Sequence, residues 1–385
     1  MKQILLAFSI VVAMLSLQFI LPPKQFPIYK DQALRDKATS LAMRSMPNDY
    51  NTLLSIVDTK DNPITKQKVI LGRQLYNDTI LSKSENISCN SCHTIKQKAE
   101  NVLLNTLLGK NKTATNCAAC HTMDNTGTDR LTFASGETPH PQRLNVQTIY
   151  NTAFAKYFTW GGDQITIKQH AINSIQDKVK LGLDKDKAVQ RIQNSSYKQQ
   201  FENIFKDGVT IDNIGKSIEA YVKTLVTRGS YDEFIDGNDS AISDEAKRGF
   251  ANFINFGCKG CHTGIAVGGE SLQKFPLRKY ARVFDMNINY SFEKGEIINN
   301  SLPFENKGGF VGNKNNKFKV PSLRNVTKTS PYFHNGAVFK IRDAVNIMAK
   351  HQTGKNLNDK QIDEIVEFLK TLEGQVVRYK EVYDD

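Results

Sequence analysis

All six cysteines of this 385-residue chain occur in three C-x-x-C pairs, and a histidine follows each pair directly. Two thiols at this spacing lie on one edge of a helical turn, where they can form thioethers with the two vinyl groups of one porphyrin. The residue after the pair then directs its imidazole at the iron. The pattern predicts three covalent c-type haems, attached at Cys89, Cys92 and His93, at Cys117, Cys120 and His121, and at Cys258, Cys261 and His262.

Other uses of cysteine fit this spacing less well. An even cysteine count in an exported chain ordinarily predicts disulfides, but here no cysteine falls outside the three C-x-x-C-H units. Zinc requires four ligands from paired motifs, and three separate units do not pair off. A redox dithiol would need a thioredoxin-like strand–helix–strand context, which is missing from the sequence.

The formal net charge of the chain is +12. A basic surface can face nucleic acid, anionic lipid or an acidic protein. No nucleic-acid-binding motif occurs, and the lysines are scattered rather than clustered. The charge therefore favours an acidic redox partner or a membrane surface, and no nucleic-acid partner is expected.

The N-terminus predicts export. Lys2 precedes an uncharged apolar run over residues 4–21, and Pro22 and Pro23 follow it. A positive start with such a run is typical of a signal peptide, although this run is also just long enough to span a bilayer. Residues 1–22 are thus either a cleaved signal or a membrane anchor. Both alternatives place the rest of the chain in the periplasm, and the second tethers it to the inner membrane.

The remaining sequence predicts a mainly α protein with two cytochrome c-like haem domains. Apolar residues recur with helical spacing over residues 71–76, 211–225, 243–254 and 358–372, and Ser243 and Asn358 are expected N-caps. Residues 31–46 show weaker helical periodicity, and residues 103–108 could form two amphipathic turns. Residues 231–241 are predicted to be a linker. The predicted organisation is a tether over residues 23–64, an N-terminal domain with two haem motifs over residues 65–236, and a C-terminal one-haem domain over residues 237–385.

Several segments around the motifs carry a more specific pattern, which spans about residues 65–374. It comprises LGRQLYNDTILS at residues 71–82, NVQTIYN at 145–151, FTWGG at 158–162, GCKGCHTG at 257–264, KVPSLRNV at 319–326 and SPYFHNG at 330–336. Together these segments resemble the bacterial dihaem cytochrome c peroxidase family, which also contains the MauG-type enzymes. The resemblance implies that hydrogen peroxide is reduced to water at a haem of the N-terminal domain, with electrons that pass through a high-potential haem of the C-terminal domain.

The resemblance also implies roles for single residues. Met348 falls where the family places the second axial ligand of the C-terminal haem, and a Met/His pair raises the reduction potential of iron. A methionine here argues against a MauG-type role, for which a tyrosine is expected. Trp160, the only tryptophan, matches an aromatic residue between the two haems, although a simple core role is the alternative. A calcium ion between the domains is implied at Asn145, Thr329 and the Pro331 carbonyl.

The chain departs from the family in its third motif. The segment over residues 71–82 leads into the motif of His93, but the text after His121 also fits, because Gly127-Thr-Asp129 follows at the family spacing. We therefore expect the haem on His121 to bind peroxide and the haem on His93 to be an insertion. Some membrane-anchored relatives, the quinol peroxidases, carry a third haem on an N-terminal extension.

The distal residues depart as well. Cleavage of the O–O bond needs a proton shuttle beside the peroxide. The family has a catalytic glutamate where this chain has Lys180, and a peroxide-binding glutamine where it has His170. A cationic lysine is a poor general base unless burial lowers its pKa. His170 or Asp177 is expected to act in its place.

Three further histidines lie outside the haem motifs. His140, between Pro139 and Pro141, either caps the iron at His121 or His93 or is an exposed loop residue. His334 is expected to be structural, and His351 is expected on the surface.

The sequence leaves three functions in view. The first is a trihaem peroxidase that takes electrons from a small cytochrome, a cupredoxin or membrane quinol, with a homodimer carried over from the family. The second is an electron-transfer cytochrome without peroxidase activity, which Lys180 and His170 favour. The third is a MauG-like oxidase of a protein substrate, which Met348 disfavours.

Overall fold

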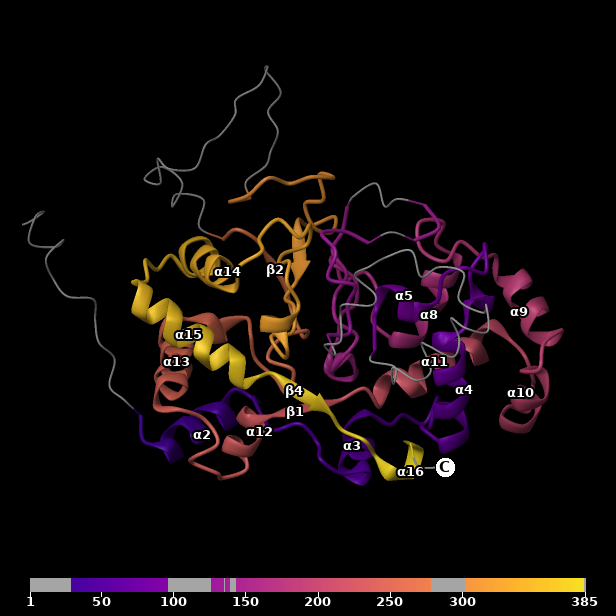
Figure 1. Ribbon diagram of the computed structural model, residues 1–385, viewed down its shortest axis with the longest axis horizontal. Helices are drawn as coiled ribbons and strands as arrows, with labels where there is room; N and C mark the ends of the chain where they lie inside the picture. The colour runs from indigo at the N-terminus through magenta and orange to yellow at the C-terminus, as the bar shows by residue number, and fades with distance from the viewer. Residues whose placement is uncertain (1–28, 96–125, 135, 139–142, 278–301, 384–385) are drawn as a thin grey trace, which may run out of the picture.

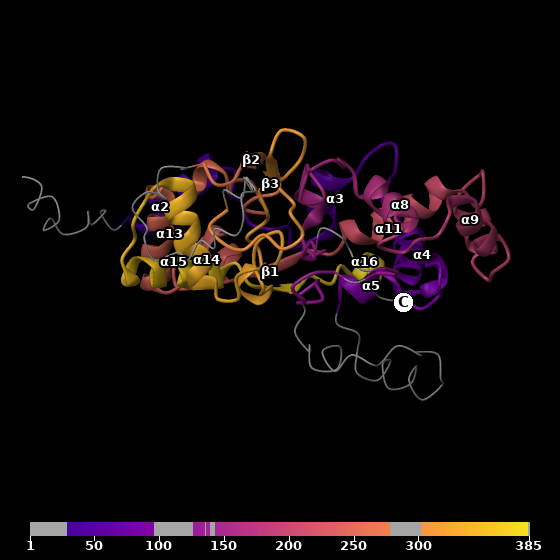
Figure 2. The ribbon, with the colours of Figure 1, turned by 90° about the horizontal axis from the view of Figure 1, so that it is seen from above.

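The computed structural model describes residues 29–95, 126–134, 136–138, 143–277 and 302–383. They form two mostly helical lobes that lie side by side along the longest axis of the molecule (Figure 1). Seen from above, the strand β1 lies between the lobes (Figure 2). No helix in the described part of the chain is long and apolar enough to cross a membrane. The predicted signal or anchor, residues 1–22, lies outside the described residues.

The N-terminal lobe is built around α11 (Ile211–Lys223). Thr210 caps this helix through its side chain, and apolar residues at helical spacing bury one face of it. It packs against α4 (Lys66–Asn77) and α8 (Ile167–Gln176). Gly72 permits the contact with α4, because a Cβ there would lie 1.9 Å from the Ser217 carbonyl oxygen. The lobe also contains α3 (Tyr50–Val57), α9 (Lys185–Gln193), α10 (Lys198–Ile204) and the 3-10 turn η2 (Thr152–Phe154).

The C-terminal lobe has α13 (Asp244–Asn255) packed along α15 (Asp359–Thr371). Ser243 and Asn358 cap these helices as predicted. The rings of Phe250 and Phe368 stack between them, with centroids 4.7 Å apart. The lobe also contains α12 (Ser230–Ile235), α14 (Ile341–Met348), the π-turn η6 (Ala349–Thr353) and the 3-10 turn η5 (Val326–Lys328). The prediction of a mainly α fold is confirmed, since the described strands form only two short sheets.

The two ends of the described chain cross to the opposite lobe. Helix α2 (Asp31–Ser40) buries Leu34 and Ala38 in the C-terminal lobe. Strand β4 (Gly374–Val376) pairs antiparallel with β1 (Thr227–Gly229), and α16 (Lys380–Tyr383) then buries Val382 in the N-terminal lobe. The second sheet, β2 (Leu272–Lys274) with β3 (Lys317–Lys319), belongs to the C-terminal lobe. The lobes are therefore interleaved rather than successive in sequence.

Three expectations about organisation were wrong. Residues 31–64 are not a tether, because α2 and α3 carry buried side chains such as Leu34 and Leu53 into the two cores. Residues 231–241 are not a simple linker, because Tyr231 and Phe234 on α12 are fully buried. The predicted boundary at residues 236 and 237 fails for the same reason. The apolar residues of these segments are spaced too sparsely to show a clear helical period, yet they are buried in the cores of the two lobes.

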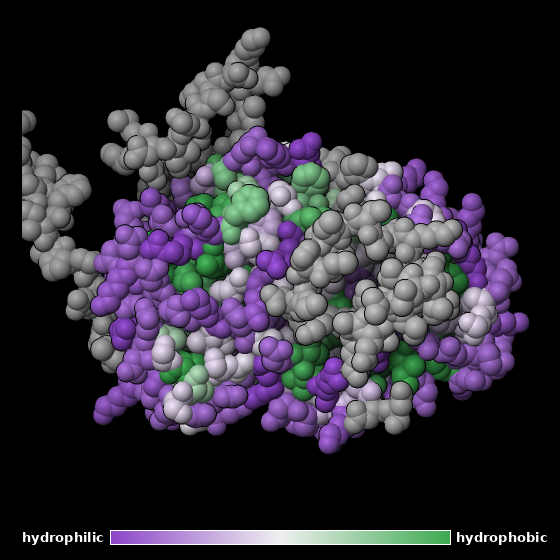
Figure 3. Space-filling model, viewed as in Figure 1, coloured by the Kyte–Doolittle hydropathy of each residue, from purple (hydrophilic) through white to green (hydrophobic). Residues whose placement is uncertain are grey.

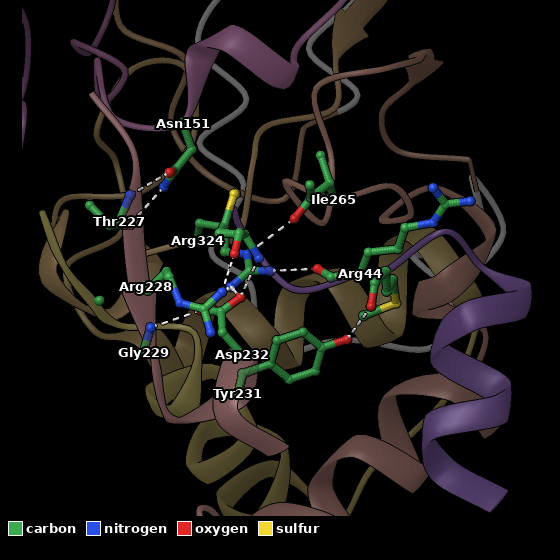
Figure 4. A network of polar contacts seen from close by, with 12 residues as sticks. Arg44, Asn151, Thr227, Arg228, Gly229, Tyr231, Asp232, Ile265 and Arg324 are labelled. Atoms are coloured by element: carbon green, nitrogen blue, oxygen red, sulfur yellow. Dashed lines mark hydrogen bonds and ion pairs between the residues drawn. The ribbon is translucent and has the colours of Figure 1, made fainter. Parts of the chain in front are cut away.

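A buried ion pair joins segments that are far apart in the sequence (Figure 4). Arg324 and Asp232 are 1% and 0% exposed, and Arg324 donates to both Asp232 carboxylate oxygens at 2.7 and 2.9 Å. Asp232 also accepts the backbone N–H of Met46 and of Gly229, both at 2.8 Å. Arg324 further donates to the Arg44 carbonyl at 3.0 Å. The network binds the segment after α2, the start of α12 and the 319–326 segment to one another.

The surface in Figure 3 is mainly hydrophilic, with hydrophobic side chains in small separate areas. Large exposed apolar residues in the described chain include Ile165 at 66% and Phe339 at 64% exposure. Scattered apolar residues of this kind are ordinary on soluble surfaces. The face seen in Figure 3 therefore gives no evidence of a broad apolar docking area.

Candidate haem sites

The first haem motif lies in the N-terminal lobe, directly after α4. The 3-10 turn η1 (Thr79–Leu81) leads to α5 (Cys89–Cys92), and Ser91 Oγ accepts the Ser88 N–H at 3.1 Å at the start of α5. Tyr76 on α4 donates its hydroxyl to the His93 carbonyl at 2.6 Å. The motif is therefore held against the central helix pair of the lobe.

The His93 ring is fixed in one orientation and one tautomer. Its Nδ1 lies 2.9 Å from the Gln147 carbonyl oxygen, which can only accept, so Nδ1 carries the proton. The other nitrogen, Nε2, is left with a lone pair for a metal. Burial is the main cause that lowers the pKa of His93 to about 4, which keeps the ring neutral.

The C-terminal motif begins where α13 ends. Gly257 has a φ of 92°, a left-handed conformation that turns the chain out of the helix and into the 3-10 turn η3 (Cys258–Gly260). His262 is buried, and its Nδ1 lies 3.4 Å from the Val267 carbonyl oxygen. Burial lowers the pKa of His262 to about 4. Both described motif histidines thus present a neutral ring with Nε2 available.

The residues present fit covalent haem. The four described cysteines are free thiols with partly exposed side chains, so none is locked in a disulfide. Gln147 Nε2, beside His93, is a buried donor with no hydrogen-bond partner among the described residues. In the same part of the chain, no three His, Cys, Asp or Glu side chains form a metal-binding group that would favour zinc. The third motif, with Cys117, Cys120 and His121, lies outside the described residues.

His170 faces the same part of the N-terminal lobe from α8. Its Nδ1 lies 2.6 Å from Gln164 Oε1, and its ring stacks on Phe158 with centroids 6.1 Å apart. Burial first, and then the charges of Lys180, His93 and Lys319, lower the pKa of His170 well below its ordinary value. The ring is therefore neutral, and its Nε2 forms no hydrogen bond within the described chain.

Lys180 and Asp177 follow α8 in a tight turn. Lys180 Nζ lies 3.6 Å from Asp177 Oδ2 and 3.5 Å from Ser174 Oγ, and the Lys180 side chain is 33% exposed. Its charge contributes to lowering the pKa of both His93 and His170. The structure thus places Lys180 near both His93 and His170, whereas the sequence led us to expect Lys180 and His170 beside the haem on His121; Asp177 pairs with Lys180.

Trp160 and Lys319 lie where the two lobes meet. Trp160 is 9% exposed and donates its Nε1–H to the Asn145 carbonyl at 2.8 Å. The Lys319 N–H donates to the Trp160 carbonyl at 2.9 Å, and Lys319 Nζ donates to Gln147 Oε1 at 2.7 Å. Gln147 also holds His93, so these contacts connect β3 of one lobe to the haem motif of the other.

Lys319 makes the stability of the protein depend on pH. Burial lowers the pKa of Lys319 from 10.5 to about 8. Between these two values the unfolded chain holds a proton that the folded chain has released, so stability rises with pH. We expect the free energy of unfolding of the wild type, relative to Lys319→Met, to rise between pH 8 and 9.5 with a slope approaching about 1.4 kcal/mol per pH unit. Denaturant titrations at several pH values test this, with Lys314→Met as an exposed control; parallel curves for wild type and Lys319→Met would contradict it.

The family is decided by comparison with known proteins. A family model described as di-haem cytochrome c peroxidase matches residues 66–114 and 101–240. The cytochrome c551 peroxidase of Nitrosomonas europaea is 31% identical over 315 residues, which cover 80% of this chain and 81% of that protein. The chain belongs to the dihaem cytochrome c peroxidase family. It is accordingly an oxidoreductase of the peroxidase type, with covalent haem.

Two further comparisons agree with this assignment. The cytochrome c551 peroxidase of Pseudomonas aeruginosa is 29% identical over 361 residues, or 91% of this chain and 90% of that protein. A crystal structure of a MauG-like protein associated with microbial copper homeostasis shares the fold, with a TM-score of 0.60 at 19% identity, covering 85% of this chain and 95% of that one. The predicted family is therefore confirmed. The first range matched by the family model contains His93 and the second contains His121, so the match does not choose between these motifs.

In this member of the peroxidase family, Met348 is the last residue of α14, and the π-turn η6 follows it directly. Burial raises the pKa of Cys261, and Gln352 on this turn partly offsets that rise. Met348 lies four residues before Gln352 and is partly buried. His351, expected on the surface, is 1% exposed; that expectation was wrong, because the π-turn directs this residue inward.

The remaining predicted ligands are only partly described. Asn145 is buried, its N–H donates to the His334 carbonyl at 2.7 Å, and its Nδ2 donates to the Leu131 carbonyl at 2.8 Å. Thr329 Oγ1 donates to the Val326 carbonyl at 3.0 Å, and Pro331 follows a cis peptide bond. His334 is buried, and its Nε2 is hydrogen-bonded to Asn306 Oδ1 at 2.8 Å, an environment that suits the expected structural role. His140 lies outside the described residues.

Sequence reasoning missed the residues that orient the haem-site histidines. Gln147 and Gln164 supply the acceptors for His93 and His170, and both lie in or beside segments that carried the family pattern. Asp129 was also missed as a titrating group, although burial raises its pKa to about 6. A glutamine in a loop gives no periodic signal, so only its contact in the fold reveals this role.

Proposed function

We propose that this chain is an exported trihaem peroxidase that reduces hydrogen peroxide to water. Two electrons and two protons per peroxide yield two water molecules. The observation that carries the proposal is that His93 in the N-terminal lobe shares one region with His170 and Lys180, while Trp160 and Lys319 connect it to the His262 lobe. The peroxidase names of relatives at 29% and 31% identity support the same reaction.

Three haems are proposed, one at each C-x-x-C-H motif. When bound, they supply the iron that peroxide requires and the path that electrons follow. Cys89, Cys92 and His93 would hold the haem of the N-terminal lobe, and Cys258, Cys261 and His262 would hold that of the C-terminal lobe. We infer that His93 rather than His121 serves the peroxide site, against the expectation from sequence, because His93 and Lys180 both lower the pKa of His170. The haem on His121 is then an additional electron carrier.

His170 is proposed to move the peroxide proton. Its Nδ1 is held by Gln164, so its free Nε2 can accept a proton from one peroxide oxygen and return it to the other as the O–O bond breaks. The Asp177 carboxylate faces Lys180 Nζ at 3.6 Å, so Asp177 is not proposed as the proton acceptor. His170 thus replaces the glutamate that the family resemblance predicts at Lys180.

Met348 is proposed as a residue that, together with His262, would hold the iron of the C-terminal haem. Because thioether sulfur favours the reduced iron, Met348→His should lower the reduction potential of one haem by about 0.2 V. Spectroelectrochemical titration measures this directly. Met43→Leu, a buried substitution in the same lobe, is the control and should leave all potentials in place. A potential unchanged by Met348→His would remove Met348 from the ligand set.

The remaining features follow from the sequence. The chain is proposed to be periplasmic, with residues 4–21 as a signal or a membrane tether, and a small cytochrome, a cupredoxin or quinol as donor. A calcium ion at Asn145, Thr329 and Pro331, and a homodimer, remain proposals from the family resemblance.

Steady-state turnover tests the function. With a reduced small cytochrome c as donor, peroxide should oxidise the donor at a rate proportional to enzyme. Cys258→Ala with Cys261→Ala should abolish this rate while the other haems remain attached, as counted by mass spectrometry. A pure electron-transfer cytochrome would carry all its haems and consume no peroxide, and a MauG-like enzyme would require a protein substrate.

A further inference from the structure

Positive charge gathers beside His93 in the N-terminal lobe. Lys180 and Lys319 both lower the pKa of His170, and Lys180 also lowers the pKa of His93 and of Cys92. Lys319 is 6% exposed and lies with its Nζ 6.0 Å from the centre of the Phe158 ring, which itself stacks on His170. Two cations from different lobes therefore lie close enough to the His170 ring to lower its pKa.

The carboxylates near these cations are few in the described chain. Asp177 is 3.6 Å from Lys180 Nζ, a longer separation than a strong ion pair, and its side chain is 37% exposed. Asp129 raises the pKa of Cys92, a cysteine of the haem motif. Burial raises the pKa of Asp129 itself to about 6. The Nζ of Lys319 has only the neutral Gln147 side-chain amide as its hydrogen-bond partner in the described chain. The charge of this region is thus not cancelled by its neighbours.

The Lys180 ammonium has no close hydrogen-bond acceptor among the described residues. An ammonium group carries three N–H donors, and the Lys180 contacts to Ser174 and Asp177 are both long, at 3.5 and 3.6 Å. The backbone of Lys180 is fixed, since its N–H donates to the Asp177 carbonyl at 2.9 Å and its carbonyl accepts the Glu137 N–H at 2.8 Å. A fixed backbone with a loosely held ammonium suits a side chain that completes its contacts with a bound group.

We propose that Lys180, assisted by Lys319, makes the region beside His93 and His170 a binding site for small monoanions. A cation in a partly buried site stabilises a bound anion more than a neutral molecule of the same size. Among oxidants, the site then favours a peroxide that carries negative charge, such as the hydroperoxide anion. This inference rests on the proposed function in one respect, namely that Cys89 and Cys92 hold a haem.

Azide and carbon monoxide test the proposal as an anionic and a neutral probe of similar size. Azide is titrated into the half-reduced holoprotein, and carbon monoxide into the fully reduced holoprotein, with absorption spectra as the readout. For Lys180→Gln the Kd of azide should rise about tenfold, and for Lys180→Glu further, because a unit charge near the ligand is removed and then reversed. The Kd of carbon monoxide should change less than about twofold, since a neutral ligand gains little from that charge.

Lys178→Gln is the matched control. Lys178 is exposed, lies two residues away in the same turn, and loses the same charge. It should leave the azide Kd within about twofold, because solvent screens exposed charges. Equal azide affinity in wild type and Lys180→Gln, equal losses for both probes, or no azide binding to the wild type would each overturn the proposal. Peroxide turnover is measured separately on the same samples, so an anion site without turnover would refute the proposed function alone.

Discussion

Replacing Asp232 by Asn should lower the free energy of unfolding by about 3–5 kcal/mol. The substitution removes the carboxylate charge that Arg324 faces at 2.7 and 2.9 Å, and both side chains are almost fully buried. Breaking a buried pair on one side leaves an uncompensated charge in a medium of low polarity, which destabilises far more than losing an exposed pair. The same change weakens the two backbone contacts to Met46 and Gly229.

Asp363→Asn is the matched control for this prediction. Asp363 also pairs with an arginine, Arg342, but both side chains are about half exposed. Exposed pairs contribute at most about 1 kcal/mol, so this variant should unfold near the wild-type denaturant midpoint. The double variant Asp232→Leu with Arg324→Met should lose less than the sum of the two single variants. Equal stability of Asp232→Asn and Asp363→Asn would show that the buried ion pair does not stabilise the contact between the segment after α2, α12 and the 319–326 segment.

Replacing His170 by Ala should lower kcat for peroxide reduction at least about a hundredfold. A positioned proton acceptor contributes about 10²–10⁴ in rate, and His170 is the neutral base beside His93. Its Nε2 acts in the reaction, so the loss should appear in kcat more than in KM. Added imidazole should restore part of the rate to His170→Ala and none to His170→Leu, whose side chain fills the space.

His334→Gln is the control for the second prediction. His334 is likewise a histidine whose ring is held by an amide, that of Asn306, but it is not among the residues that shift the pKa of His93. This variant should keep kcat within about threefold, because no reacting proton passes through it. Comparable losses in His170→Ala and His334→Gln, or no imidazole rescue, would assign His170 a structural role.

Much of the fold followed from local patterns in the sequence. The capped helices α4, α11, α13 and α15 were predicted from apolar spacing and from caps such as Ser243 and Asn358, because those signals depend on neighbours within one helix. The interleaving of the lobes was not predicted. The burial of Leu34 and Val382 depends on surfaces more than a hundred residues away, which no local pattern records.

The site divides in the same way. The haem motifs were predicted from spacing, since attachment chemistry fixes the distance between residues, and Met348 was predicted from the family resemblance and stays a prediction. The Gln147 backbone carbonyl that holds His93, the Gln164 side chain that holds His170 and the buried Lys319 emerged only from the fold, because none of these contacts leaves a periodic signal in the sequence. His351 was placed on the surface because a lone histidine near polar residues gives no sign of a π-turn.

The most direct test of the central claim is stopped-flow mixing of the half-reduced protein with hydrogen peroxide, with haem absorption recorded throughout. The proposed function predicts that one haem of the half-reduced protein is high-spin before mixing. It also predicts that peroxide is consumed as the C-terminal haem is oxidised, and that His170→Ala slows this phase. If all haems stay six-coordinate and low-spin and peroxide is not consumed, the peroxidase account is wrong and the chain is an electron-transfer cytochrome.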